Sequence, residues 1–285
     1  MVVFTLRLKE PPTVPVDARR IKPDKLIGKT LEEILNIKLR EGSRVVRLRD
    51  LFEVTGPEKA PESPGEIEMV IEGEGSEKLR YLGYKMSAGK IIVKGNIGGM
   101  TGYKMKGGTI VIEGDAASWL GAKMKDGLIE VHGDAGDFVG SKLQGEKPGK
   151  GMKGGMIIIH GNAGSNIGAG MGGGAIIIEG DAGDLVGAHM TGGSILVCGK
   201  AGRFTGARMT GGKIIVSGLI DGILPSFYVD SIVGSAKVKS YKFKKPFMMF
   251  IGDVLVNGMG KLFVALNENR ELLKHYEELL EDIVI

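Results

Sequence analysis

One pattern of apolar positions and glycines recurs along the middle of the chain. The pattern G-x-x-M-x-x-G-x-[IL]-x-[IV]-x-G occurs seven times between residues 83 and 218. Its closing glycines are 19 residues apart, except that 28 residues separate the third from the fourth. A fixed period of this size is typical of solenoids, in which each repeat buries its apolar face by stacking on the next. The closing glycines are Gly95, Gly114, Gly133, Gly161, Gly180, Gly199 and Gly218.

Each repeat predicts one short strand. Apolar β-branched residues alternate with other residues in pairs such as Ile110/Ile112 and Ile176/Ile178, and glycines bound each pair. This alternation predicts strands with one buried face. A period of 19 residues is too short for a strand, a helix and both turns, because a βαβ unit takes about 30 residues. We therefore predict an all-β fold, a right-handed parallel β-helix of about seven coils.

The regular spacing also places one methionine in every repeat. We predict that these methionines fill the narrow interior, since the side chain is flexible and apolar. A soft-metal column is the alternative, but no cysteine or histidine column accompanies them. The many glycines predict tight corners with positive φ. The methionines are Met86, Met105, Met124, Met152, Met171, Met190 and Met209.

The repeat divides the chain into three regions. Residues 1–66 form a flank with an extended segment Val2–Leu8 and a short helix that begins at the capping box Thr30–Glu33. Residues 67–218 are the predicted β-helix. Residues 219–285 leave the period and end in an amphipathic helix. Because repeat arrays need atypical ends, we predict that the two flanks are caps. The apolar face of the helix is expected to carry Leu272, Tyr276, Leu279, Leu280 and Ile283.

The longer interval between the third and fourth closing glycines predicts a surface loop. Residues 142–150 contain the glycine, proline and charge typical of an excursion. We expect this loop to leave the stack and return in register, so that Met152 stays in the methionine column.

Composition narrows the class of protein. The net charge of +4 does not by itself indicate nucleic acid, and the single cysteine, Cys198, excludes an internal disulfide. No basic and apolar leader opens the chain, and no apolar run approaches the length of a membrane span. We expect a soluble cytoplasmic protein without a membrane span or nucleic-acid partner.

Stacking aligns equivalent residues into columns, and three polar columns suggest ligands. His132 and His160, flanked by Glu113 and Glu179, suggest either a metal site or a solvated charge ladder. The residues after the closing glycines are mostly Asn and Asp, which suggests either calcium or side chains that bond their own backbone in a turn. The ladder and the turn are the simpler interpretations. A third column with its neighbours is basic and predicts either a solvated face or an anionic ligand; it comprises Lys85, Lys104, Lys123, Lys142, Lys106, Lys125 and Lys153.

The sequence contains no recognisable catalytic set. There is no P-loop, no nucleophile elbow, and no dinucleotide fingerprint placed between a strand and a helix. We assign no catalytic, cofactor-binding or metal-ligating residue.

Two apolar columns predict covered surfaces. One lies between the inward positions of the strands and therefore points outward. The other contains the only tryptophan of the chain. Contiguous apolar stripes are uncommon on free monomers, so flanking segments or other proteins should cover them. The docking candidates are Val111, Ile158, Ile177 and Leu196 in the first column, and Trp119 and Phe138 in the second.

The tandem repeats resemble the C subunit of formylmethanofuran dehydrogenase, a glycine-rich β-helix that is shared with the C-terminal domain of the glutamate synthase large subunit. The flank supports the first family: Ile21-Lys-Pro-Asp24, Gly28-Lys-Thr-Leu-Glu-Glu33 and Leu48-Arg-Asp-Leu-Phe-Glu-Val54 look like its leader.

The resemblance implies a non-catalytic subunit of an archaeal-type oxidoreductase complex. That complex reduces carbon dioxide and attaches the formyl group to methanofuran in the first step of methanogenesis. A molybdenum or tungsten pterin, iron–sulfur clusters and a metal site are then expected in the pterin-binding, ferredoxin-type and amidohydrolase-like partner subunits. A stand-alone glutamate-synthase-type protein that supports an amidotransferase is the alternative. A carbohydrate-active β-helix enzyme is disfavoured, because it needs carboxylates that converge in one cleft.

Overall fold

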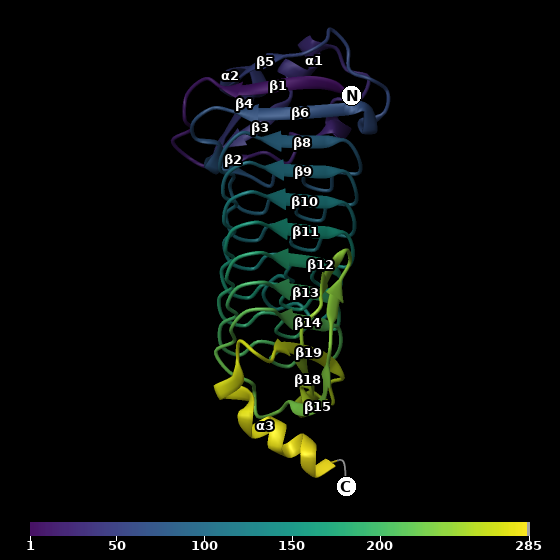
Figure 1. Cartoon of the computed structure of the whole chain (residues 1–285). Helices are drawn as coiled ribbons and strands as arrows, with labels where there is room; N and C mark the ends of the chain where they lie inside the picture. The colour runs from purple at the N-terminus through teal and green to yellow at the C-terminus, as the bar shows by residue number, and fades with distance from the viewer. Residues whose placement is uncertain (284–285) are drawn as a thin grey trace.

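The computed structural model describes residues 1–283, with the side chains of residues 278 and 280–283 left undescribed. The chain is an elongated stack of strands, with the N-terminal segment at one end and the C-terminal helix at the other (Figure 1). Among the described residues, the α-helices are α1 (Leu31–Leu35), α2 (Leu48–Leu51) and α3 (Arg270–Ile283), and the remaining regular structure is mostly β. The all-β prediction is confirmed at this level.

One sheet runs along the whole stack. Within residues 1–283 it joins 13 strands in the order β15-β18-β19-β14-β13-β12-β11-β10-β9-β8-β6-β1-β5, and every pair from β1 to β19 in this order is parallel. The repeats supply β8 (Lys90–Val93), β9 (Thr109–Ile112), β10 (Leu128–Val131), β11 (Met156–Ile159), β12 (Gly172–Ile178), β13 (Gly192–Val197) and β14 (Lys213–Val216). Each repeat therefore contributes one strand, and no α-helix lies within residues 67–218.

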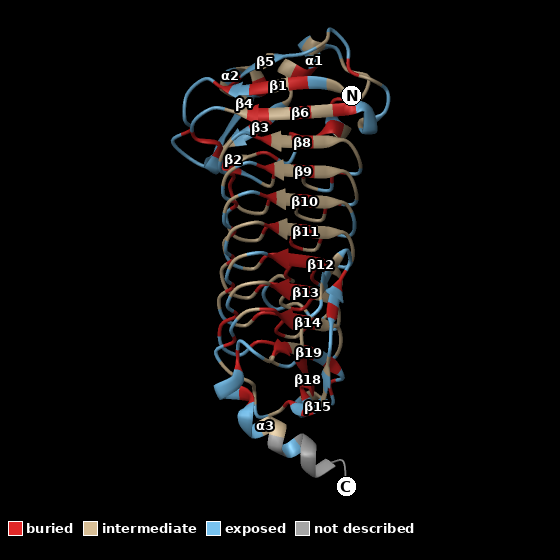
Figure 2. Ribbon diagram, in the orientation of Figure 1, coloured by how far each residue is buried: buried red, intermediate tan, exposed pale blue. Residues whose placement is uncertain are grey.

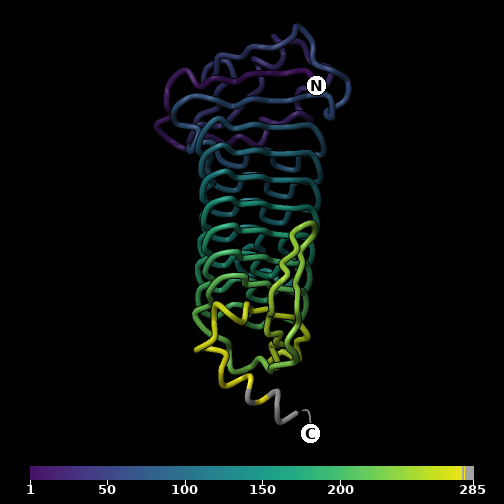
Figure 3. The backbone as a smooth tube through the Cα atoms, viewed as in Figure 1, coloured from purple at the N-terminus to yellow at the C-terminus, as the bar shows by residue number. Residues whose placement is uncertain are grey.

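Successive repeats lie directly on one another. After each strand the chain turns away and comes back beside the same strand one level on (Figure 3). A second line of parallel bridges holds the returning segments together and links Ile97, Ala116, Ala135, Ala163, Ala182, Ala201 and Ile220. A repeat thus contacts mainly its two neighbours. Equivalent residues of successive repeats therefore lie next to one another on adjacent levels of the stack.

The methionine column forms the core, as predicted. All seven repeat methionines are 0% exposed, and so are the inward strand residues, for example Ile176 and Ile178. Buried and intermediate residues alternate along β8 to β11, whereas β12 to β14 are mostly coloured as buried (Figure 2). Because the interior is narrow and every level presents the same set of side chains, one flexible thioether per level fills it.

The Asn and Asp column forms a hydrogen-bonded ladder between repeats. Each side-chain Oδ1 accepts a hydrogen bond from the backbone N–H of the next member of the column. The prediction that these side chains bond their own turns is therefore wrong. Stacking brings the next repeat's N–H closer than any local donor. The bonds run from Asp115, Asp134, Asn162, Asp181 and Lys200 to Asn96, Asp115, Asp134, Asn162 and Asp181 over 2.7–2.8 Å.

We expect Asp134→Ala to destabilise the fold by about 1–3 kcal/mol, because it removes a charged acceptor from the backbone N–H of Asn162. Asp134→Asn should lose much less stability, since Asn96 and Asn162 of this column accept the same hydrogen bond with their side-chain Oδ1. Thermal unfolding of the two variants tests this. Equal melting temperatures for both variants would mean that the ladder contributes nothing.

The nine-residue excess is a loop that returns in register. Lys142 N–H donates to Ala169 and Gly151 N–H donates to Gly170, so both ends of the loop rest on the next repeat. Met152 keeps its column, as predicted. Its N–H donates to the carbonyl of Gly140, as the other repeat methionines donate to their opening glycines. The structural opening glycine of the fourth repeat is therefore Gly140. The sequence pattern placed it at Gly149, because Gly149 also lies three residues before the methionine.

Deletion of Leu143–Lys150, with a glycine-compatible turn in its place, should leave the fold intact, because Lys142 and Gly151 already lie side by side on the same neighbouring repeat. A melting temperature within a few degrees of the unmodified chain and the same far-ultraviolet circular dichroism spectrum are expected. Global unfolding of the deleted chain would show that the loop is part of the core.

The N-terminal segment lies across the first repeats. Val2–Leu8 is β1, as predicted, and it pairs in parallel with β6 (Ile67–Glu72) and antiparallel with β5 (Phe52–Thr55). The capping box at Thr30 and Glu33 that begins α1 is also confirmed. A smaller four-stranded sheet completes this end and consists of β2 (Val16–Asp17), β3 (Lys38–Glu41), β4 (Arg44–Arg47) and β7 (Leu79–Arg80). Three 3-10 helices connect these strands, at Pro23–Lys25, Pro64–Glu66 and Ser76–Lys78.

The C-terminal segment rejoins the sheet. β19 (Gly260–Ala265) pairs in parallel with β14 although it lacks the repeat pattern, and β18 (Phe247–Gly252) and β15 (Tyr228–Val233) follow antiparallel. A hairpin of β16 (Ala236–Val238) and β17 (Tyr241–Phe243) extends back along the side of the stack (Figure 1). A 3-10 helix covers Val254–Val256.

Helix α3 packs on the stack through Leu273 and Tyr276, of which the predicted apolar face includes Tyr276. Leu273 is buried, and Tyr276 meets Phe250 edge to face with ring centroids 5.0 Å apart. Leu272 and Leu279, which were predicted on the apolar face, are 38% and 41% exposed. The remaining predicted members, Leu280 and Ile283, lie outside the described side chains.

Candidate functional site: exposed columns of the stack

One column of corner residues has a left-handed backbone throughout. Its members have φ between 60° and 69°. This conformation costs a residue with a Cβ about 1–2 kcal/mol, whereas glycine adopts it freely. The turn therefore does not explain why bulky side chains occupy these corners. The column consists of Tyr81, Met100, Trp119, Phe138, Asn166, Leu185 and Phe204.

The middle of this column forms an aromatic groove. Trp119 and Phe138 are half-buried, and their rings stack at 4.4 Å with an angle of 9°. The groove beside them has a volume of about 430 Å³ and is lined by residues of several repeats and of the loop. We call it the aromatic groove. Its lining is Trp119, Phe138, Lys142, Leu143, Gln144, Asn166, Ala169, Leu185, Ala188, His189, Ala207 and Arg208.

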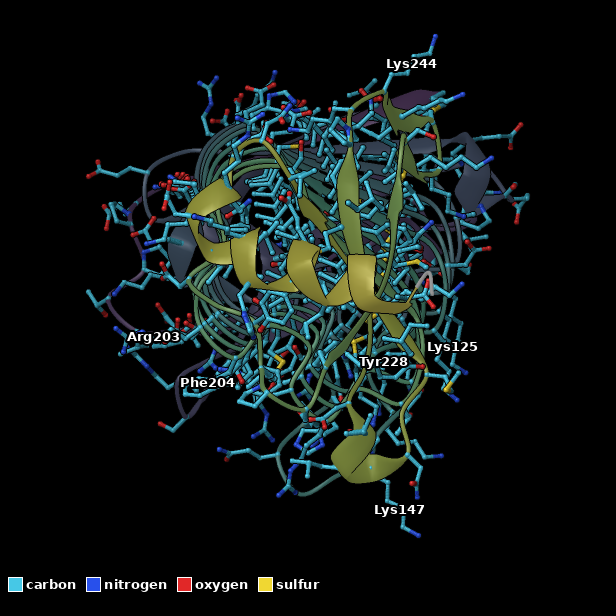
Figure 4. All side chains as sticks on the ribbon, turned by 60° about the horizontal axis from the view of Figure 1, so that its bottom comes forward. Lys125, Lys147, Arg203, Phe204, Tyr228 and Lys244 are labelled. Atoms are coloured by element: carbon cyan, nitrogen blue, oxygen red, sulfur yellow. The ribbon has the colours of Figure 1, made fainter. Side chains whose placement is uncertain are left out.

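Basic side chains border the apolar floor of the aromatic groove. Burial, followed by the nearby charges of Lys142 and Arg208, lowers the pKa of His189, which favours its neutral form. An apolar floor with two aromatic anchors and a cationic border suits a protein segment that carries an apolar side chain and acidic flanks. Phe204 extends the same column and is 54% exposed. Seen obliquely from the end that carries α3, Phe204 lies beside Arg203, on a different side of the stack from Lys125 (Figure 4).

The strand column with the other docking candidates is partly covered by the chain itself. Ile177 and Leu196 are fully buried in a cluster with Ala236 and Val238 of the β16–β17 hairpin. They contact the chain's own flank and present no surface to a partner. Val111 and Ile158 are half-buried, and Ile158 packs at the edge of the same cluster. Nothing in the repeat pattern indicates that this hairpin folds back, because residues 219–285 lack the repeat.

The basic column forms a lysine pocket of about 310 Å³. Lys85 and Lys104 place their ammonium groups over the rings of Tyr84 and Tyr103, at 5.1 and 5.0 Å. Lys123 pairs with Glu146 of the loop. The arrangement suits a ligand with several negative charges. The pocket is lined by Lys85, Lys104, Lys106, Lys123, Lys125, Lys150, Gly151 and Lys153.

The lysine pocket differs from the predicted basic column at two residues. Lys142 was predicted in the basic column, but it lies over Gly170 and lines the aromatic groove. Lys150 of the loop takes a place in the pocket that the sequence did not indicate. Both loop ends rest on the fifth repeat, where the N–H of Lys142 donates to Ala169 and the N–H of Gly151 donates to Gly170, so the loop places Lys150 at the pocket and Lys142 beside the groove.

The two histidines of the polar column lie side by side on the outer face of the sheet. The ring centroids of His132 and His160 are 5.6 Å apart. Nδ1 of His160 lies 2.9 Å from Glu179 Oε2, and its Nε2 lies 3.0 Å from Glu130 Oε1. These hydrogen bonds, that to Glu179 first, raise the pKa of His160. Glu113, which the sequence placed in this cluster, pairs with Lys94 instead.

No nucleophile with a supporting base emerges among the residues with described side chains. Cys198 is half-buried, and burial followed by the charge of Glu179 raises the pKa of its thiol, which disfavours the reactive thiolate. Nor is any helix in residues 1–283 long and apolar enough to cross a membrane.

Sequence comparison connects the chain to curated proteins. It is 45% identical over 98 residues to the C subunit of the tungsten-containing formylmethanofuran dehydrogenase 2 of Methanothermobacter wolfeii. It is 39% identical over 96 residues to the C subunit of the molybdenum-containing formylmethanofuran dehydrogenase 1 of Methanothermobacter thermautotrophicus. These matches cover 34% and 33% of this chain, and 35% and 22% of the relatives' own lengths. No model of a known protein family matches the chain.

Structure comparison extends the likeness over almost the whole chain. One chain in the crystal structure of the formyltransferase/hydrolase complex (FhcABCD) from Methylorubrum extorquens, in complex with methylofuran, has a TM-score of 0.75 and 28% sequence identity. The match covers 92% of this chain and 99% of that chain. The resemblance noted in the sequence is thus confirmed by curated relatives and by a solved structure.

Proposed function

We propose that this chain is a non-catalytic structural subunit of a formylmethanofuran dehydrogenase complex, an oxidoreductase that fixes carbon dioxide as a formyl group. The observation that carries the proposal is the likeness to a chain of a multi-subunit complex over 92% of this chain. The curated relatives point to the same kind of complex. The lack of a catalytic constellation among the described side chains is consistent with a supporting role.

The proposed architecture is a right-handed parallel β-helix, with residues 1–66 and 219–285 as its caps. The parallel register of β8 to β14 and the 19-residue spacing support it. The pairing of β19 with β14, the last repeat strand, supports the assignment of residues 219–285 as a cap. Such a rod presents the same face at every level, which suits a platform for other subunits.

The redox cofactors of this complex are proposed to lie in the partner subunits. Cubane iron–sulfur clusters need four cysteine ligands, and this chain has one cysteine. The pterin, the clusters and the amide-forming metal site are therefore assigned to pterin-binding, ferredoxin-type and amidohydrolase-like partners. A cytoplasmic location is part of the same proposal.

We propose the aromatic groove as the docking surface, with Trp119 and Phe138 as its anchors. Val111 and Ile158 remain candidates at the uncovered part of the strand column. The alternative function, support of an amidotransferase by a glutamate-synthase-type protein, rests only on the shared repeat. The formylmethanofuran dehydrogenase relatives named above favour the first proposal.

The purified chain alone tests the non-catalytic role. We expect it to show neither formyl transfer to methanofuran nor carbon dioxide reduction with a low-potential electron donor. The complete complex assayed beside it is the positive control. Either activity in the isolated chain would overturn the proposal.

A further inference from the structure

One carboxylate interrupts the outward strand column. The other members of this column are Ile or Val or Leu, but the third repeat has Glu130 between Val111 and Ile158 of the neighbouring strands. Carboxylates next to apolar neighbours lose hydration and need a compensating partner. The column consists of Ile92, Val111, Glu130, Ile158, Ile177, Leu196 and Ile215.

The strand register brings Glu130 to two histidines. Glu130 and His132 are two residues apart, so both point to the outer face of β10 and its extension. His160 follows β11, and the pairing of Val131 with Ile159 places it beside His132. One ligand atom from each of the three side chains lies within 4.8 Å of the others. The parallel pairing of β10 with β11 fixes the backbone positions of these three residues relative to one another.

A fourth residue orients the central histidine. Glu179, one repeat further on, holds Nδ1 of His160 at 2.9 Å, which leaves Nε2 facing Glu130 and His132. Metal-binding histidines commonly donate the second ring N–H to a carboxylate, which fixes the tautomer. Tyr241 of the hairpin lies 3.4 Å from the other oxygen of Glu179 and anchors that carboxylate in turn.

We propose that Glu130, His132 and His160 bind a divalent transition-metal cation, with Zn²⁺ as the best fit. Two imidazole nitrogens and one carboxylate oxygen are ligands that zinc prefers, and the open side of the exposed sheet face leaves a fourth position for water. Tetrahedral ligand atoms are about 3.3 Å apart when the metal–ligand bonds are about 2.0 Å. The observed 3.0 Å between His160 Nε2 and Glu130 Oε1 needs only a small side-chain rotation to reach that distance.

The cation would join the third and fourth repeats, which the loop of residues 142–150 separates in sequence. Binding would therefore stabilise the stack at its longest connection. This inference does not depend on the proposed function, because it uses only residues of this chain.

Zinc titration of the full, metal-stripped chain by isothermal calorimetry tests the proposal. The unmodified chain should bind one equivalent of Zn²⁺, and Co²⁺ in its place should give the visible absorption of a tetrahedral site. Glu130→Ile, which restores the apolar column, and His132→Ala and His160→Ala should each weaken binding at least tenfold. Glu179→Gln should weaken it by about 10-fold to 100-fold without changing the stoichiometry.

His189→Ala is the matched control, because His189 lies in the aromatic groove and not in this cluster. It should bind zinc as the unmodified chain does. Circular dichroism establishes whether each variant is folded. If a histidine variant does not fold, zinc binding by the folded Glu130→Ile variant still decides the test. The absence of a stoichiometric zinc isotherm in the unmodified chain, or unchanged binding by folded Glu130→Ile, would overturn the proposal.

Discussion

Trp119→Glu is expected to weaken the association of this chain with its partner subunits by about 30-fold or more, while the chain stays folded. Trp119 is half-buried, and it stacks on Phe138 outside the methionine core, so its loss removes little core packing. Buried aromatic anchors at interfaces commonly contribute about 2 kcal/mol or more, which corresponds to this factor. A glutamate there would also place a charge on the apolar floor of the groove. The affinity of the purified variant for the partner subunits, measured by surface plasmon resonance, gives the answer.

Met100→Glu is the matched control for this variant. Met100 has the same left-handed backbone one repeat earlier, with φ of 64° against 69° for Trp119, and it does not line the aromatic groove. It should reduce the affinity much less. If Trp119→Glu assembles with unchanged affinity, the assignment of the aromatic groove as the docking surface is wrong.

Gly168→Ala is expected to destabilise the fold by about 2–4 kcal/mol, because it combines a left-handed backbone with a core clash. The φ of Gly168 is +67°, and an added Cβ would lie 2.5 Å from Cδ1 of Ile195. Ile195 is fully buried, so its side chain has no free space to enter. The same contact recurs at Gly187 with Ile214, which shows that stacking requires glycine at this position. Chemical unfolding measures the loss of stability.

Gly145→Ala separates the backbone effect from the clash. Gly145 has φ of +77° but nothing lies within 4 Å of an added Cβ, because it is in the loop. Its substitution should reduce stability by only about 1 kcal/mol. Equal destabilisation by the two substitutions would show that the core at Ile195 accommodates the extra carbon.

The repeat predicted the parts of the fold that stacking alone determines. Once Ile176 and Ile195 occupy equivalent positions 19 residues apart, their parallel pairing follows, as does the burial of Met171 and Met190. The position of the loop could be predicted for the same reason, since the extra residues must leave the stack if Met152 is to stay in the methionine column. These features depend on the period of the sequence and on little else.

The remaining features depend on contacts between residues without a common period. The β16–β17 hairpin covers Ile177 and Leu196, but its own sequence has no repeat that would place it there. Glu130 occupies one outward position of an otherwise apolar column. Its relation to His160 becomes visible only when the register of β10 and β11 is known. The ladder through Asp134 was missed because a side chain within a turn usually has a closer donor in its own turn than in another repeat.

Purification of the native complex through a tag on this chain tests the central claim most directly. The account predicts that mass spectrometry of the purified assembly identifies pterin-binding and amidohydrolase-like subunits in fixed stoichiometry with the chain. Recovery of the chain alone, or with a glutamine amidotransferase in their place, would contradict it.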